Sequence, residues 1–324
     1  MMAARVRTPD YRCITVRTVT LVLEYFHPWP NSAGFYFARD RGWYRQAGID
    51  LEIRTVDHGR GDALAYLSRG EAQLGIFPGN RLLVRREAGE DLVAIAAINQ
   101  RGLETIRTRR DTGITRLREL EGKRIAYNPT PRGIAVVRSL IARDGGDPDN
   151  FVTVDAGARE LDPATGFDGI ADATFGSYWA WDNLLTSYPP DSEVVWRVDD
   201  ELGVGYHGYL LGGRPDALEA GLLADLLDVT GRGYQAAAND QEAAAASFEL
   251  VTPYFPPSVI RASLAAIAPT WFHAGDWGVI REELIGPYAH WLADQGILRA
   301  PDTWAEALSP ARVRATSALR GTPA

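Results

Sequence analysis

The sequence predicts an α/β protein built of two lobes. Strand-like apolar runs alternate with helical patterns from the N-terminal region to Phe175, and such alternation is typical of a mostly parallel sheet. The alternation falls into two sets, which a charged connector from Arg101 to Arg116 separates. Within the first set, Leu92–Ile98 is apolar without a break, as expected for a strand buried on both faces of a sheet.

The first set opens with the predicted strand Ile14–Phe26, which is rich in Val, Ile, Thr and aromatic residues. A Pro-Trp-Pro segment ends it, and Asn31 and Ser32 can then cap a helix over Ala33–Arg41. The remaining predicted elements of this set are the strands Leu51–Val56, Gln73–Phe77 and Leu92–Ile98, and the helices Asp62–Arg69 and Leu82–Glu87.

The second set follows the connector and has the same character. Thr130 and Pro131 form a typical helix start, with the threonine as cap and the proline at the first helical position. From Pro215 onward the pattern is mainly helical, and the end of the chain, Ser309–Ala324, is expected to be a loosely held tail. The predicted elements of the second set are the strands Lys123–Tyr127, Val152–Val154 and Ile170–Phe175, and the helix Pro131–Arg143.

The composition excludes several classes of protein. Of 324 residues, 46% are apolar and 23% charged, which is typical of a globular chain and not of a disordered one. The net charge of −8 provides no overall attraction to nucleic acid or anionic lipid, so neither is an expected partner. Lys123 is the single lysine among 34 basic residues, which leaves little room for lysine-based covalent catalysis. A single cysteine, Cys13, excludes an intramolecular disulfide.

Neither a metal site nor a membrane segment is predicted. The five histidines show no HxxxH or HxH spacing, and no run approaches the ~20 apolar residues that a membrane-spanning helix needs. The N-terminal stretch contains no clear export signal, so the sequence as written predicts a cytoplasmic location, or an extracytoplasmic one if the true start lies upstream. The charge run Arg107–Arg110 is expected to form a solvated face.

Five segments, in order, resemble the thiamin-pyrimidine-synthase-like branch of the periplasmic binding protein superfamily. Each is weak alone, but together they cover roughly residues 18–250. They are Gly34–Tyr44 with Ala47–Ile53, Leu67–Ile76, Leu117–Ala126, Gly169–Ala173, and Pro215–Leu218 followed by Gln241–Ala245.

This resemblance implies a two-lobed fold of the type II periplasmic-binding-protein kind, with a ligand cleft between hinged lobes. It places the first part of lobe 1 at 14–103, lobe 2 at 104–200, the return to lobe 1 at 201–308, and a tail at 309–324. Most members are solute-capture subunits of ABC transporters, so a permease is the expected partner if the chain is exported. The stretches His27–Gly34 and Tyr178–Asp182 resemble binders of pyrimidines and riboflavin more than binders of sulfonate or nitrate.

One branch of this family contains an enzyme, the fungal pyrimidine synthase, which uses a lysine-held pyridoxal phosphate and consumes its own histidine. Here Phe77 stands about where the lysine is expected, and Arg81 about where the histidine is expected. The cysteine-rich motif of that enzyme is also absent, since Cys13 is alone. The resemblance therefore argues against that chemistry, and no cofactor is expected.

The predicted ligand contacts of lobe 1 follow the first and third strands. The loop after the first strand contains two prolines that stiffen it, and it carries the rings of Tyr25, Phe26 and Trp29. Flat rings at this position suit a flat heteroaromatic ligand. The alternative for these rings is a place in the core. Asn31 and Ser32 act either as plain caps or as a site for a ligand oxygen at a helix N-terminus. Phe77 and Asn80 flank a strand-to-helix turn that is either ordinary or part of the site.

In lobe 2 the turn after the first strand carries Asn128 and Thr130 as candidate ligand contacts. Its prolines count against a cradle for phosphate or sulfonate, which is usually rich in glycine and serine. Arg132 follows, either as a contact for a carboxylate or, the preferred expectation, as a solvated side chain.

The cluster Tyr178-Trp-Ala-Trp-Asp182 is the most informative one in the chain. Trp179 and Trp181 can stack on a ligand, and Asp182 can accept two ring N–H groups of an aminopyrimidine. The alternative is that the aromatic residues form core between the lobes. Near the expected return crossover, Tyr206 and His207 are further ligand candidates among three glycines that could absorb a hinge rotation.

These features lead to one leading function and two alternatives. The leading one is a binding protein for a small, flat, nitrogenous heteroaromatic molecule, such as a thiamin pyrimidine precursor or a flavin. The second is a cytoplasmic enzyme on the same scaffold that acts on a small aromatic or heterocyclic metabolite, with His27, Asp182 and His207 as acid–base candidates. The third is a cytoplasmic sensor or regulatory binding module.

Overall fold

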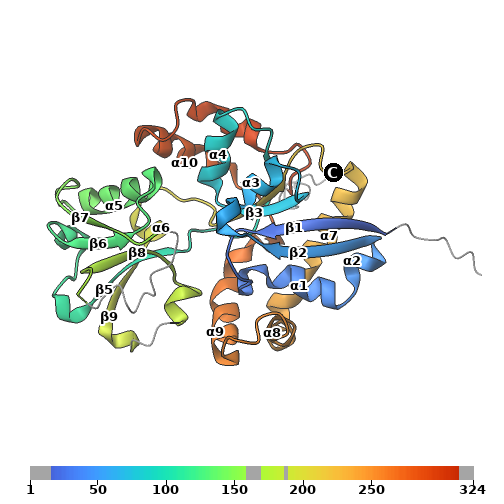
Figure 1. Ribbon diagram of the computed structural model, residues 1–324, viewed down its shortest axis with the longest axis horizontal. Coiled ribbons are helices and arrows are strands. Elements are labelled where there is room, and N and C mark those ends of the chain that lie inside the picture. The colour runs from blue at the N-terminus through green and yellow to red at the C-terminus, as the bar shows by residue number, and fades with distance from the viewer. Residues whose placement is uncertain (1–15, 158–168, 186–188, 314–324) are drawn as a thin grey trace, which may run out of the picture.

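Two separate sheets organise the protein, whose computed structural model describes residues 16–157, 169–185 and 189–313. We call lobe 1 the part built on the sheet with strand order β2-β1-β3-β10-β4, and lobe 2 the part built on the sheet with order β7-β6-β8-β5-β9. The lobes lie side by side, with lobe 2 on the left and lobe 1 on the right of Figure 1. The α/β fold of two lobes predicted from the sequence is confirmed.

The sheet of lobe 1 has a parallel part and one reversed strand. Strands β1, β2 and β3 pair in parallel, and β10 is antiparallel to both β3 and β4. All five residues of β4 are buried, as the apolar run Leu92–Ile98 predicts. The strands are β1 (Arg17–Leu23), β2 (Ile49–Thr55), β3 (Leu74–Phe77), β4 (Val93–Ala97) and β10 (Leu210–Gly213).

Helices cover both faces of this sheet. One buried cluster packs α1, α7, α8 and α9 on one face, and a second packs α3, α4 and α10 on the other. The predicted cap of α3 is confirmed, because an Asp62 carboxylate oxygen accepts from the Ala65 N–H at 2.9 Å. The helices are α1 (Ala33–Asp40), α2 (Trp43–Gln46), α3 (Ala63–Ser68), α4 (Gly79–Glu87), α7 (Ala220–Asn239), α8 (Gln241–Glu249), α9 (Pro257–Ile267) and α10 (Glu282–Asp294).

Lobe 2 repeats the strand–helix pattern in a smaller form. Strand β6 is parallel to β7 and β8, whereas β5 is antiparallel to β8 and β9. The predicted start of α5 is confirmed, since the Thr130 hydroxyl accepts from the Gly133 N–H at 3.1 Å and Pro131 is its first residue. The elements are β5 (Glu104–Arg109), β6 (Arg124–Tyr127), α5 (Pro131–Arg143), β7 (Val152–Asp155), β8 (Ala173–Tyr178), β9 (Glu193–Arg197) and α6 (Val198–Glu201).

The charged connector of the sequence contains a strand, which corrects two predictions. Strand β5 lies inside the sheet between β8 and β9, within the segment expected to be a connector. Arg107, expected on a solvated face, is fully buried. Its Nη2 donates to both carboxylate oxygens of Glu193, at 2.5 and 2.7 Å, and this partner on β9 compensates the buried charge.

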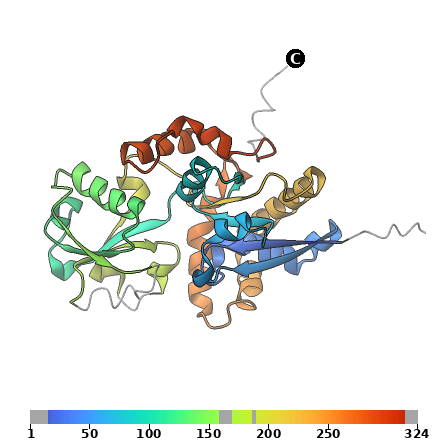
Figure 2. The same ribbon diagram turned by 45° about the horizontal axis from the view of Figure 1, so that its top comes forward.

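The chain passes between the sheets from β4 to β5 and returns from α6 to β10. Helix α10 follows much later in the sequence and lies across the upper side of both lobes in Figure 2. Its Tyr288 stacks on Tyr206 of the return segment, with ring centroids 5.0 Å apart. The second buried cluster therefore continues from lobe 1 through Tyr206 and α10 into lobe 2.

The last part of the chain differs from its prediction. Ser309, expected to begin a loose tail, donates its N–H to the Ala94 carbonyl of β4 at 2.9 Å, and Val313 donates to the Ile95 carbonyl at 2.8 Å. The rest of the expected tail lies outside the described residues. Smaller elements are the hairpin β11 (Phe272–His273) and β12 (Asp276–Trp277), and the 3-10 helices Pro30–Ser32, His58–Arg60, Arg110–Thr112, Leu117–Leu120, Asp182–Leu184, Pro190–Ser192, Ala268–Trp271 and Pro301–Ala307.

Candidate functional site: a cleft between the lobes

A cleft of about 1310 Å³ lies between the two lobes. Its walls come from the segments that follow β1 and β3 in lobe 1, and from the segments that follow β6 and β8 in lobe 2. The carboxyl ends of parallel strands are where open α/β sheets bind their ligands. Leu103, Glu104 and residues 206–209, from the two segments that join the lobes, also line the cleft.

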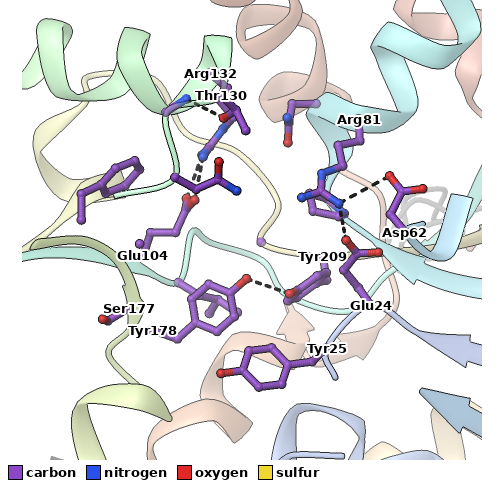
Figure 3. A pocket seen from close by; sticks show the side chains of 18 of the residues that line it. Glu24, Tyr25, Asp62, Arg81, Glu104, Thr130, Arg132, Ser177, Tyr178 and Tyr209 are labelled. Carbon is purple, nitrogen blue, oxygen red and sulfur yellow. Dashed lines mark hydrogen bonds and ion pairs between the residues drawn. The ribbon is translucent and has the colours of Figure 1, made fainter. Parts of the chain in front are cut away.

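Aromatic rings form the base of the cleft (Figure 3). The hydroxyls of Tyr178 and Tyr209 are hydrogen-bonded at 2.7 Å, with their rings perpendicular. The ring of Tyr25 lies beside them, 6.1 Å from that of Tyr178 between centroids. Phe26 stacks on Tyr25 at 4.7 Å and is 46% exposed, so its ring remains accessible from the cleft. These surfaces suit a flat ligand.

Asp182 connects this aromatic base across the two lobes. The Tyr25 hydroxyl of lobe 1 donates to one carboxylate oxygen of Asp182 at 2.5 Å, and the backbone N–H of Tyr178 donates to the other at 2.7 Å. Asp182 lines the cleft as predicted from the sequence, but both of its oxygens already accept bonds from the protein. A ligand N–H would have to share these oxygens or displace the tyrosine.

The tryptophans of the predicted cluster take the alternative role that the sequence left open. Trp181 is fully buried among residues of lobe 1, with its ring 6.1 Å from Trp29 and 4.8 Å from Phe255. Trp29 is buried in the same cluster. Trp179 packs under the Arg197 guanidinium at 4.1 Å from its ring centre. None of the three lines the cleft, so these rings join the lobes instead of facing a ligand.

Asn31 and Ser32 also lie behind the cleft wall. The amides of Asn31 and Asn99 exchange two hydrogen bonds, at 3.0 and 2.7 Å, and both side chains are buried. The Ser32 hydroxyl donates to the Trp29 carbonyl at 2.9 Å. Neither side chain caps α1, which corrects the prediction of a side-chain cap. Phe77 is fully buried in the core, whereas Asn80, in the first turn of α4, lines the cleft.

The wall formed by lobe 1 carries a network of charges. Arg81 bonds to Glu24 through a short ion pair, and its Nη1 lies 3.4 Å from Asp62 (Figure 3). Asp62 also pairs with Arg85 at 2.7 Å. Every charged side chain of this wall therefore has an opposite charge beside it.

The wall formed by lobe 2 carries a second charged group, built around Arg132. Its two terminal nitrogens donate to the two oxygens of Glu104, at 2.6 and 2.7 Å, and its Nε donates to the Tyr288 hydroxyl at 2.6 Å. The Tyr206 hydroxyl donates to Glu104 at 2.7 Å. Arg132 is 12% exposed, so the expectation of a solvated arginine is wrong. Asn128 and Thr130, the candidate ligand contacts of lobe 2, line the same wall.

The two histidines near the cleft differ in their surroundings. His207 is buried, its Nδ1 lies 2.9 Å from the Asn99 carbonyl, and its Nε2 accepts from the Arg281 N–H at 3.1 Å. Burial lowers the pKa of His207 to about 4, so the ring is neutral at pH 7 and serves the fold. The Nδ1 of His27 lies 2.7 Å from the Pro28 carbonyl, and its ring packs on Phe26.

The structure thus brings together nine of the residues singled out from the sequence and places six others behind the wall. The nine that line the cleft are Tyr25, Phe26, His27, Asn80, Asn128, Thr130, Asp182, Tyr206 and His207. The six that do not are Trp29, Asn31, Ser32, Phe77, Trp179 and Trp181. Sequence reasoning missed Glu24, Glu104 and Tyr209, although each adjoins a segment it singled out.

Pyridoxal phosphate does not fit this cleft. The single lysine, Lys123, is not among the lining residues, and the sequence position considered for the cofactor lysine is the buried Phe77. Cys13 lies outside the described residues. Within the described part of the chain, no group of three His, Cys, Asp or Glu side chains is placed to hold a metal ion. In the same part, no helix combines the length and apolarity that crossing a membrane requires.

Two α/β lobes with a cleft at the carboxyl ends of their strands define a protein of the periplasmic binding protein fold. The chain belongs to the NMT1/THI5-like family, whose model matches residues 29–244. No curated protein sequence matches the chain.

Solved structures with the same fold include both binding proteins and an enzyme. The alkanesulfonate-binding protein SsuA from Xanthomonas axonopodis pv. citri, bound to MOPS, is 19% identical with a TM-score of 0.68, over 92% of this chain and 98% of that chain. The Candida albicans CA3427 gene product is 16% identical with a TM-score of 0.67, over 94% and 100%. A mutant of the desulfurization enzyme DSZB with biphenyl-2-sulfinic acid is 15% identical with a TM-score of 0.63, over 89% and 95%.

Proposed function

We propose that this protein is a solute-binding protein of the ABC-transporter type, which captures a small, flat, nitrogenous heteroaromatic molecule between its lobes. The cleft carries the proposal, because aromatic rings from both lobes meet at its base beside polar groups that can orient a ligand. Stacking on Phe26 and the neighbouring tyrosines would hold the flat face of the ligand. The amide of Asn80, which both donates and accepts, suits the edge of a pyrimidine or flavin ring.

Lobe closure completes the proposed mechanism. We place the two moving bodies as residues 14–103 with 201–308, and residues 104–200. The segments between β4 and β5 and between α6 and β10 join these bodies and act as the hinge. Closure would bring the α5 wall towards the α4 wall and bury the ligand from water. The names of the similar binding proteins support this capture role and an extracytoplasmic location with a permease partner, and they give no support to the cytoplasmic location.

The alternative of an enzyme draws on DSZB, which has the same fold. Two of the three acid–base candidates, His207 and Asp182, give it little support. His207 is buried, with both ring nitrogens beside backbone groups, and Asp182 accepts bonds from Tyr25 and from the Tyr178 backbone. Capture without chemical change therefore remains the proposal that the geometry favours.

A thermal-shift panel of pyrimidines, flavins, aromatic carboxylates and sulfonates tests the proposed function. A ligand that binds only the folded protein, at 100 times its dissociation constant, adds ~2.7 kcal/mol of stability, so its unfolding temperature rises clearly. Phe26→Ala should weaken binding of the best ligand about two- to tenfold, since stacking contributes ~0.5–1.5 kcal/mol.

Val152→Ala is the matched control, because Val152 is an exposed apolar residue of β7 that does not line the cleft. It should leave the affinity unchanged. A panel in which no pyrimidine or flavin shifts the unfolding temperature would contradict the proposed ligand class.

A further inference from the structure

We propose that the cleft selects against anionic ligands and that Glu104 is the residue that sets this selection. The inference rests on the proposed function, namely that the cleft captures a small molecule. It concerns the charge of that molecule, which the aromatic base does not determine.

The first observation is that the carboxylate of Glu104 already binds the guanidinium of Arg132. An arginine on the wall of a binding cleft is a natural partner for a sulfonate or carboxylate, because its donors match two oxygens at once. Here the two terminal nitrogens of Arg132 already donate to the two oxygens of Glu104, and its Nε donates to the Tyr288 hydroxyl. The pair is shielded from solvent, with side chains 12% and 19% exposed. An incoming anion would have to displace this carboxylate from the Arg132 guanidinium and so break a shielded ion pair.

The opposite wall repeats the same arrangement. Arg81 is paired with Glu24 and Asp62, and Arg85 is paired with Asp62 and with Glu90. The Glu24 side chain is 11% exposed, whereas that of Arg81 is 42% exposed. Both walls therefore present arginines that are already neutralised by carboxylates of the chain.

The sum of charges points the same way. Among the residues that the structure describes, three arginines line the cleft, namely Arg81, Arg85 and Arg132, against four carboxylates, namely Glu24, Asp62, Glu104 and Asp182. The neutral ring of His207 adds no positive charge at pH 7. The N-termini of α4 and α5 add about half a positive charge each, which brings the sum over the described lining residues close to zero. Such a cleft favours an uncharged ligand over a sulfonate of the same shape.

Removing the charge of Glu104 should reverse the preference of the cleft for an uncharged ligand over an anionic one. Glu104→Gln keeps the length of the side chain and an oxygen for the Tyr206 hydroxyl, but leaves the Arg132 guanidinium without an anionic partner. A ligand anion can then supply the missing charge. Glu24→Gln tests the same idea on the other wall, where the Arg81 side chain is 42% exposed.

The experiment compares two probes of nearly the same shape, benzenesulfonate and the uncharged benzenesulfonamide, by calorimetric titration of the full chain. In the wild type, benzenesulfonate should bind at least tenfold more weakly than benzenesulfonamide. Glu104→Gln should improve benzenesulfonate binding at least tenfold relative to benzenesulfonamide, and Glu24→Gln should change the ratio in the same direction. Thermal unfolding confirms that each variant is folded.

Asp172→Asn is the matched control. Asp172 pairs with Arg124 of lobe 2 through two oxygens, as Glu104 pairs with Arg132, but it does not line the cleft. It changes the net charge by the same amount and should leave the ratio of the two affinities unchanged.

The outcomes separate this inference from the proposed function. A wild type that prefers benzenesulfonate overturns the inference and keeps solute capture intact. No gain of benzenesulfonate binding in folded Glu104→Gln and Glu24→Gln also overturns it. A gain in the variants supports the inference even if no pyrimidine or flavin binds the wild type, a result that would contradict the proposed ligand class alone.

Discussion

His207 shows how a polar side chain near the cleft can serve the fold. Histidine beside glycine at a lobe crossover is compatible with either a ligand contact or a structural role. In the structure its two nitrogens lie beside the backbone of Asn99 and of Arg281, which are 108 and 74 residues away in the chain. The ring thereby links β4's end, the return segment and the start of α10. Such distant backbone partners leave no local signal in the sequence.

The neutral state of His207 makes stability depend on pH. Its pKa is about 4 in the folded protein against about 6.5 in an unfolded chain, so the unfolded chain binds the proton more tightly between these values. Its contribution to stability is therefore complete above pH 6.5 and is lost as the pH falls towards 4. Between pH 7.5 and pH 5 we expect a loss of about 2 kcal/mol, measured by urea unfolding at both values.

His207→Gln is the control for this pH dependence, because glutamine keeps hydrogen-bonding groups but does not take up a proton. The variant should be less stable at pH 7.5 and should lack most of the loss between pH 7.5 and pH 5. An equal loss in the variant and the wild type would show that other groups cause the pH dependence.

At the scale of single residues, local rules predicted well and distant partners were missed. The caps Asp62 and Thr130 are confirmed because a cap bonds to a backbone N–H only three residues away. Trp181 could not be assigned, since the choice between ligand and core depends on whether Trp29 and Phe255 come near it. The pairing of Arg132 with Glu104 was missed for the same reason, because these residues come together only in the folded chain.

Among the elements, apolar runs predicted β1 to β4 and β6 to β8, and they missed β5 and β9, which carry charged residues. Strands β1 to β4 and β6 to β8 were predicted with shifted ends, because their apolar runs are clear. Strand β5 has the sequence Glu-Thr-Ile-Arg-Thr-Arg, which is typical of an exposed segment. Its Arg107 is buried because it pairs with Glu193 of β9, a partner that is distant in the sequence. A strand stabilised by an ion pair with another strand gives no apolar pattern of its own.

The packing of α1 against α7 gives a prediction that belongs to these two helices. A Cβ atom on Gly34 would lie 2.3 Å from the Tyr234 ring, and one on Gly233 would lie 2.3 Å from the Gly34 carbonyl oxygen. Gly34→Ala should force the helices apart and destabilise the protein by about 1–3 kcal/mol, as overpacking typically does. Chemical denaturation measures this change.

Gly221→Ala is the comparison for the Gly34 variant. Gly221 also lies in α7, but a Cβ atom there meets no other atom within 4 Å. It should leave stability unchanged or slightly higher, because alanine is the better helix former. Equal effects of the two substitutions would show that close approach of the helices is not the cause.

At the scale of the whole molecule, contacts on two sides hold the lobes together around the cleft. On one side, Trp181 of lobe 2 is buried against lobe 1, and the Tyr25 hydroxyl bonds to Asp182. On the other, Arg132 of lobe 2 bonds to Tyr288 of α10, which lies across both lobes. These contacts limit the directions in which the lobes can move relative to each other. The sequence predicted the two lobes and the cleft, but these connections required the structure.

Calorimetric titration of the wild type and of Asn80→Trp tests whether the ligand lies in this cleft. Asn80 lines the cleft in the first turn of α4, so a tryptophan there would fill space that the ligand needs. Using the ligand with the largest thermal shift, we expect one site per chain in the wild type. Asn80→Trp should show no binding heat and should unfold at a temperature close to that of the wild type. Unchanged binding by the folded variant would show that the ligand binds outside this cleft.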